Sequence, residues 1–202
     1  YMALKADVGS AALVGIDGLT AQITSLSVEV NNTNDTVSPN RVLDFAGANS
    51  RDVATGPAPA PVVTIDIDGA EGVLLSVATN ISLDVFGFVQ LDGTMSFKKA
   101  TGSFVLSDAT PLTDVGYMEI GGSVTSAFAG VGGIGFELTD VTFAIVMVSD
   151  TKGTPATTDD VNYMALKADV GSAALVGIDG LTAQITSLSV EVNNTNDTVS
   201  PN

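Results

Sequence analysis

The sequence contains no cysteine, no histidine and no tryptophan. The absence of cysteine excludes a disulfide framework, and the absence of both cysteine and histidine excludes thiolate and imidazole metal sites. Catalysis by a Ser-His-Asp triad or a Cys-His pair is excluded for the same reason. The sequence contains no other motif whose residue spacing would bring catalytic groups together. We therefore expect that the chain is not an enzyme.

Basic residues are also scarce. Seven lysine and arginine residues stand against 23 aspartate and glutamate residues, which gives a formal net charge of −16. A nucleic acid needs a basic face, so nucleic-acid binding is not expected, whereas divalent cations or basic partners would be attracted. No apolar run is long enough for a membrane span. The chain begins without the features of a signal peptide, and we interpret it as an internal or mature piece of a protein.

An exact internal repeat is the main feature that the sequence does contain. Residues 1–40 return letter for letter as residues 163–202, at an offset of 162 positions. The offset predicts one full, domain-sized period, residues 1–162, followed by the start of the next period, residues 163–202. Identity that extends through the loops is not needed for a fold. It therefore indicates a tandem array or a very recent duplication.

Strand patterns dominate the chain. Valine, isoleucine, threonine and phenylalanine alternate with small polar residues, and no capped segment sustains a helical period. The predicted strands include residues 19–30, 42–45 and 62–68. Residues 73–91 are predicted to form one or two long strands with a bulge at Gly87. The polar run at 31–40 and the proline-rich run at 46–61 are predicted loops.

Asp-Gly pairs occur four times and predict tight turns, because both residues tolerate the positive φ of a type I′ turn. The strongest hairpin signal is Asp92-Gly93, which lies between the apolar residues Leu91 and Met95. The other pairs begin at Asp17, Asp68 and Asp179.

A second, diverged repeat lies inside the exact period. Residues 117–145 match residues 163–192 after a one-residue gap, so that Ile120 corresponds to Leu166 and Ile145 to Val192. In both copies the apolar phase slips by one residue, at 139–140 and at 186–187. Such a slip turns the following side chains to the other face unless the chain bends or bulges. We therefore predict a corner between two short strands at each slip.

Together these patterns predict an all-β fold with an elongated tandem-repeat architecture that continues across the repeat boundary. A solenoid-like or rolled sheet is favoured, and a series of β-sandwiches is the alternative. Covering each exposed sheet edge with the next repeat would remove an aggregation hazard and stabilise neighbouring units. The contact between repeats is predicted at the start of the repeated segment. Its residues are Tyr1, Met2, Leu4, Tyr163, Met164 and Leu166.

Clustered carboxylates suggest two calcium sites, calcium being the only cofactor that the sequence suggests. Asp66, Asp68 and Glu71 lie at a strand-to-turn junction, where hard oxygen ligands could converge. Asp159 and Asp160 lie at the entry to the second copy, where a bound calcium ion would stiffen neighbouring units. Turn formation and a solvated linker are the respective alternatives. The first place lacks the ligand run of an EF-hand.

Residues 1–31 and 82–99 resemble repeat units of giant bacterial surface or secreted proteins, which are large, acidic, adhesin-like and calcium-associated. The similarity is one of pattern, G-[IV]-x-G-[IL] followed by alternating strand residues. It implies an extended, all-β structural role outside the cell or at the cell surface. The glycine-rich calcium nonapeptides of many such proteins are missing from this chain.

Two functions of different classes are predicted. The first is a structural unit of an extracellular fibre, surface appendage or adhesin stalk, whose partners are neighbouring repeats or identical subunits. The second is a calcium-dependent adhesive or glycan-binding module that uses the acidic loops.

Overall fold

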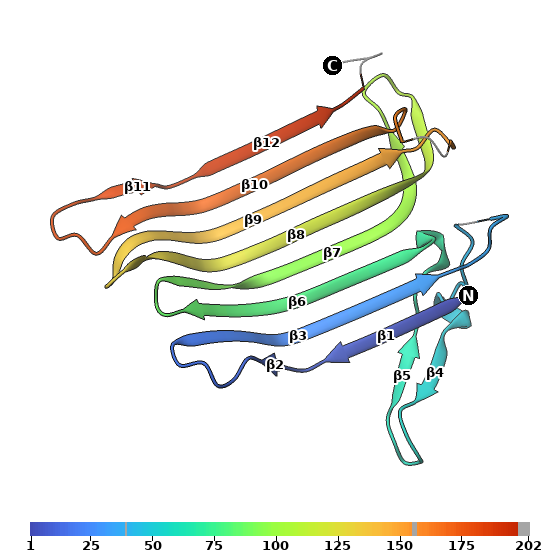
Figure 1. Ribbon diagram of the computed structural model, residues 1–202, viewed down its shortest axis with the longest axis horizontal. Helices are drawn as coiled ribbons and strands as arrows, with labels where there is room; N and C mark the ends of the chain where they lie inside the picture. The colour runs from blue at the N-terminus through green and yellow to red at the C-terminus, as the bar shows by residue number, and fades with distance from the viewer. Residues whose placement is uncertain (39, 155–156, 198–202) are drawn as a thin grey trace.

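A computed structural model describes residues 1–38, 40–154 and 157–197 of the chain. One large antiparallel sheet dominates the structure, and a small hairpin lies beside one end of its strands (Figure 1). The strands of the large sheet are β1 (Met2–Val8), β2 (Ala11–Ala12), β3 (Leu19–Asn32), β6 (Leu74–Val85), β7 (Val89–Val105), β8 (Pro111–Val131), β9 (Ile134–Asp150), β10 (Val161–Val176), β11 (Ala183–Ile185) and β12 (Leu188–Thr195).

The strand order is β1-β3-β6-β7-β8-β9-β10, with β2 beside β3 and with β11 and β12 both beside β10. The small hairpin pairs β4 (Arg51–Ala54) with β5 (Val62–Ile65). Among the described residues the only helical turns are the short 3-10 segments η1 (Gly47–Asn49) and η2 (Gly69–Glu71). The prediction of an all-β fold is therefore confirmed.

Most predicted strands are present, but two local predictions are wrong. Residues 42–45 are not a strand; the Phe45 N–H donates to the Ile67 carbonyl at 2.9 Å, and no ladder continues from this bond. Residues 46–61 are not entirely a loop, because β4 lies within them and pairs with β5. The proline-rich part of that run serves as the turn of this hairpin.

The hairpin predicted at Asp92-Gly93 is also wrong. Both residues lie inside β7, where the register with β8 shifts between them. A Cβ atom on Gly93 would lie 2.5 Å from the Ser123 carbonyl oxygen, so glycine permits a close approach of β8 at this bulge. The turn that joins β6 to β7 lies instead at Phe86-Gly87. It is stabilised by the Asp84 carboxylate, which accepts a hydrogen bond from the Gly87 N–H at 2.7 Å.

The diverged repeat corresponds to a β-hairpin. Three hairpins, β1–β3, β8–β9 and β10–β12, have the same register. In the first, Leu4 pairs with Val30. At the equivalent places Ile120 pairs with Ile145, and Leu166 pairs with Val192. These pairs are the ones that the sequence match between residues 117–145 and 163–192 places at equivalent positions.

The predicted corners appear only as local irregularities. The strand β9 runs through residues 139–140 without a break, although Asp140 has a φ of 53°. Its counterpart in the second copy is interrupted between β11 and β12. In the first copy, the register of β3 with β6 shifts between Ile23 and Ser25. The chain absorbs each phase slip by a bulge or a short break within one sheet.

The two faces of the large sheet differ in polarity. Directly paired residues share a face, so a row of partners can be followed across the strands. One such row is apolar throughout: Ala6, Val28, Val77, Phe97, Ile120, Ile145, Leu166 and Val192. This apolar face extends from one edge of the sheet to the other.

Buried side chains gather on the opposite face, near one end of the strands. One cluster contains Ile67, Leu74 and Ala100, and a second contains Leu112, Val115 and Val148. The first cluster forms where residues between β3 and β6 fold over the sheet. The second forms where the far end of the β7–β8 hairpin bends toward the ends of β9 and β10 (Figure 1).

Candidate functional site

The repeated segment supplies both edges of the large sheet (Figure 1). Its first copy places β1 at one edge, and its second copy places β12 at the other. Within the described part of the chain, β1 pairs with β3 alone and β12 with β10 alone. The two edges are therefore built from the two different strands of one repeated segment.

The predicted interface residues have different surroundings in the two copies. Tyr1, Met2 and Leu4 are exposed, with 56%, 51% and 42% of their surfaces accessible. Their copies Tyr163, Met164 and Leu166 are half-buried, because β9 and β12 flank β10.

Specific partners on β9 account for this difference. Met164 pairs with Met147, and Leu166 pairs with Ile145. Tyr163 packs against the cluster of Leu112, Val115 and Val148. The first copy has no such neighbour in the described structure, although its sequence is the same.

Strand continuity follows the position in the sheet and not the sequence. The first strand of the repeat is divided into β1 and β2 at one edge, whereas its copy β10 is continuous. The second strand shows the reverse, because β3 is continuous and its copy is divided into β11 and β12. In each case the continuous strand has neighbours on both sides. Hydrogen bonds to a strand on each side keep the strand continuous through its irregular residues, whereas hydrogen bonds to one neighbour do not.

The geometry of the sheet relates the two copies by a shift with no reversal. From β1 to β10 there are six antiparallel steps, so β10 runs in the direction of β1. If the directly paired residues are followed across the sheet from Ala6 in β1, the row reaches Leu166 in β10. Leu166 is the copy of Leu4, not of Ala6. The offset is thus two residues, about 7 Å along the strand. Because the offset is even, apolar side chains stay on the same face.

The first predicted calcium site lies beside two lysines. Asp66, Asp68 and Glu71 line one hollow together with Lys5 and Lys98. The Lys5 Nζ lies 2.7 Å from the Asp66 Oδ1, and the Lys98 Nζ lies 2.7 Å from the Glu71 Oε2. The Asp68 side chain accepts a hydrogen bond from the Ala70 N–H at 2.8 Å and so caps η2.

Lys5 links β1 to the segment between β3 and β6. Hydrogen bonds with Asp66 and Glu29 raise the pKa of Lys5, and the bond with Lys5 lowers the pKa of Asp66. The copy of Lys5, Lys167, pairs with Glu191 at 2.9 Å. Asp66 therefore acts as an ion-pair partner in this structure.

At the second predicted calcium site, Asp159 accepts hydrogen bonds from the Thr154 hydroxyl at 3.0 Å. The Asp160 Oδ1 is buried and has no hydrogen-bond partner among the described residues. No group of three or more acidic residues in the described ranges is placed to hold a metal ion. Calcium binding at either site stays a prediction.

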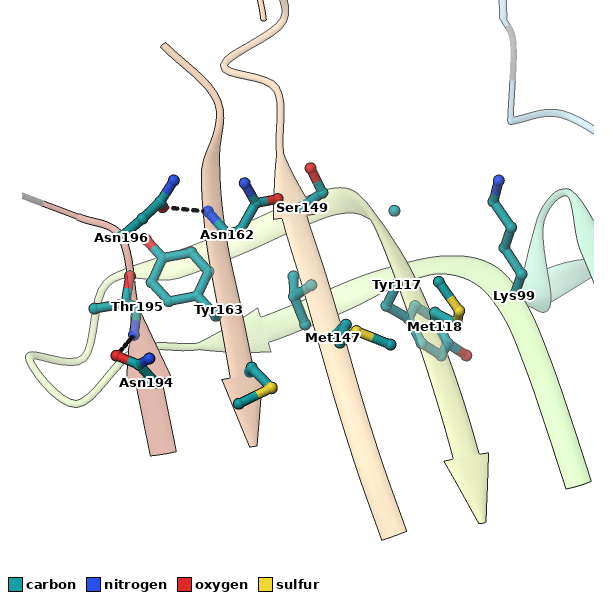
Figure 2. Close-up of a pocket in the computed structure, with 13 residues that line it drawn as sticks. Lys99, Tyr117, Met118, Met147, Ser149, Asn162, Tyr163, Asn194, Thr195 and Asn196 are labelled. Carbon is teal, nitrogen blue, oxygen red and sulfur yellow. Dashed lines mark hydrogen bonds between the residues drawn. The ribbon is translucent and has the colours of Figure 1, made fainter. Parts of the chain in front are cut away.

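A hollow of about 620 Å³ opens at the ends of β8, β9, β10 and β12, as Figure 2 shows. Its wall contains Tyr117, Met118 and Met147 from the first period, and Tyr163 and Met164 from the second copy. The Tyr163 hydroxyl is buried without a hydrogen-bond partner in the described structure. No sequence pattern indicated this hollow, because its lining is apolar and amide-rich and follows no motif.

Polar contacts fix the rim of the hollow. The Asn162 N–H donates to the Asn196 Oδ1 at 2.7 Å, which ties the start of β10 to the residue after β12 (Figure 2). The hollow therefore lies where β9 meets the second copy of the repeated segment, and both contribute to its lining.

No family model, no curated protein and no solved structure matches this chain. In the described part of the chain, no helix combines the length and the apolar character needed to cross a membrane. Function is accordingly inferred from the geometry of the repeated segment.

Proposed function

We propose that the chain is a structural unit of an extracellular repetitive fibre, surface appendage or adhesin stalk, stabilised by contacts between repeats. The relation between the two copies supports this function. The strands of the repeated segment recur in one sheet with the same direction, the same face and a two-residue offset. A relation of this kind can be repeated without limit.

In such an array, residues 1–162 form one period and residues 163–202 begin the next. Each period adds six strands, which corresponds to about 29 Å of length at a strand spacing of about 4.8 Å. The sheet then continues across the boundary as a twisted, rolled or solenoid-like ribbon, and neither β1 nor β12 remains an edge. The extracellular location is inferred from the resemblance to giant bacterial surface proteins.

The test is a series of chains with one, two and three full periods, each ending in residues 163–202. Length measured by electron microscopy and small-angle X-ray scattering should increase by about 29 Å per added period. A covalently joined sheet gives equal increments because every period adds the same strands. Separate globular beads on flexible linkers would contradict the proposal.

A calcium-dependent adhesive or glycan-binding module is the second candidate. The observation that favours it is the buried, unpartnered Asp160 Oδ1 beside Asp159, at the entry to the second copy. A bound cation would satisfy this oxygen. The melting temperature should then rise with calcium, and Asp160→Asn should abolish the rise. A melting temperature that does not change with calcium or a chelator would exclude this candidate.

A further inference from the structure

We propose that the edge of β9 that β10 covers is a docking site for β1 of a second copy of this chain, and that β10 occupies this site within the chain. The inference rests on the proposed function, and it adds the identity, the register and the exchangeability of the partner. Separate chains could then join by the same contacts that join periods within one chain.

The pairing of β9 with β10 defines what the docking edge recognises. Tyr163 through Val170 pair with the stretch of β9 from Val148 back to Val141. The residues that pair there are identical to Tyr1 through Val8. The β9 edge therefore cannot distinguish β10 from β1 of another chain over these eight positions.

The register specifies the contacts of the docked strand. Met2 would pair with Met147, and Leu4 with Ile145, as their copies do. Tyr1 would reach the cluster of Leu112, Val115 and Val148, which Tyr163 contacts. The exposed apolar side chains of β1 would thereby become half-buried, as they are in the second copy.

No pair of like charges opposes this contact between the two strands, although the chain as a whole carries a high net charge. In the required register Lys5 would face Ala144, and Asp7 would face Thr142, because Lys167 and Asp169 do so. No like charges stand directly opposite each other on these strands. A one-residue slip would instead place polar side chains on the apolar face.

The covalent connection between β9 and β10 decides which copy of the strand pairs with the β9 edge. Within one chain, only residues 151–160 separate β9 from β10, so the effective concentration of β10 at the β9 edge is far above that of a second chain. β10 also gains pairs at Val161 and Asn162, outside the repeated segment. Weakening β10 should therefore transfer the docking site to β1 of another chain.

The experiment uses the full chain and the exact repeat as its own control. The variant Leu166→Pro with Lys167→Pro removes two consecutive N–H donors and disrupts pairing of β10 with both neighbours. Sedimentation analysis should show monomers of the unaltered chain and concentration-dependent oligomers of this variant. The matched variant, Leu4→Pro with Lys5→Pro, makes the same change in β1 and should stay monomeric.

The fourfold variant, with both proline pairs, identifies the cause of association. Its β9 edge is free, but no chain offers an intact β1, so it should be monomeric. Oligomers of the fourfold variant equal to those of the β10 variant would show nonspecific association and overturn the proposal. A β10 variant that stays monomeric at high concentration would overturn it as well.

A cysteine pair tests the register, and the natural chain has no cysteine to interfere. In the β10 variant, chains with Asp7→Cys should form disulfides with chains carrying Thr142→Cys, because opposed Cα atoms about 5 Å apart suit a disulfide. Chains with Val141→Cys should not, because neighbouring residues face opposite sides. Crosslinking that is equal for both positions would contradict the proposed register.

The two proposals can fail separately. Tandem chains that lengthen by about 29 Å per period, together with a monomeric β10 variant, would leave the array intact and exclude docking between separate chains. Tandem chains that form separate beads would overturn the array itself.

Discussion

Single residues show how far a local sequence pattern can mislead. Asp92-Gly93 has the composition of a hairpin turn, yet it lies in a strand because β6 and β8 pair on either side of it. Glycine is required there for space. At Phe86-Gly87 the positive φ values are supported by the Asp84 carboxylate, which the composition of the dipeptide does not reveal.

Replacing Gly93 should therefore destabilise the sheet through a steric clash. The change Gly93→Ala places a Cβ atom 2.5 Å from the Ser123 carbonyl oxygen. We expect the free energy of unfolding to fall by about 1–3 kcal/mol, measured by urea denaturation. The control Gly116→Ala meets nothing within 4 Å and should change stability by less than about 0.5 kcal/mol. Equal effects would refute the steric explanation.

Asp35 should make the loop after β3 sensitive to acid. The N–H groups of Ser38 and Val37, followed by Arg41, lower the pKa of Asp35 from 3.8 to about 2. A lowered folded-state pKa stabilises the folded loop above pH 3.8, and this stabilisation is lost as the pH falls toward 2. Carboxyl NMR titration should place Asp35 near 2, and Arg41→Ala should raise that value. An Asp35 midpoint near 3.8 in the unaltered chain would exclude these contacts in solution.

At the scale of elements, the exact repeat separates the effect of sequence from the effect of neighbours. The stretch that forms continuous β3 also forms the divided pair β11 and β12. The pairs Leu4 with Val30 and Leu166 with Val192 show that the hairpin register is nonetheless unchanged. Local sequence thus sets the register, and pairing on the outer side sets the continuity.

Adding the next period should therefore make β11 and β12 continuous. In a two-period chain, a copy of β6 would cover this edge, as β6 covers β3. Amide hydrogen exchange at Thr186 and Ser187 should slow severalfold relative to the 202-residue chain, because protection follows stable hydrogen bonds. Exchange within β3 serves as the control and should not change. Unchanged exchange at residues 186–187 would mean that the edge remains uncovered.

At the scale of the whole molecule, net charge and edge pairing act in opposite directions. A charge of −16 repels a second chain, whereas the proposed contact between β9 and β1 would contain no opposed like charges. Repulsion therefore acts over a distance and should be screened by salt, whereas the paired edge should not.

Association of the β10 variant should strengthen as salt is raised from about 0.05 M to 0.5 M, because the screening length falls to a few ångströms. Sedimentation at each salt concentration would measure the dissociation constant, which should decrease severalfold. The fourfold proline variant should remain monomeric throughout. Association that weakens with salt would indicate an ion-pair contact instead of the proposed strand pairing.

The sequence alone determined the all-β class, the 162-residue offset and the match between residues 117–145 and 163–192. These features depend on alternation and spacing, which are local properties of the chain. The position of the β6–β7 turn and the strand in residues 46–61 were not predictable, because each depends on a partner elsewhere in the sheet. The ion pairs at Asp66 and Glu71 and the hollow beside Tyr163 were missed for the same reason.

Asparagine 31 and its copy show what only the tertiary structure decided. Asn31 is fully buried, and its side chain donates to the Leu43 carbonyl at 2.7 Å. Asn193 occupies the same place in an identical segment and is exposed. Identical residues in the described parts of the two copies thus acquire different surroundings, since burial depends on the chain segments that fold over them and not on their own sequence.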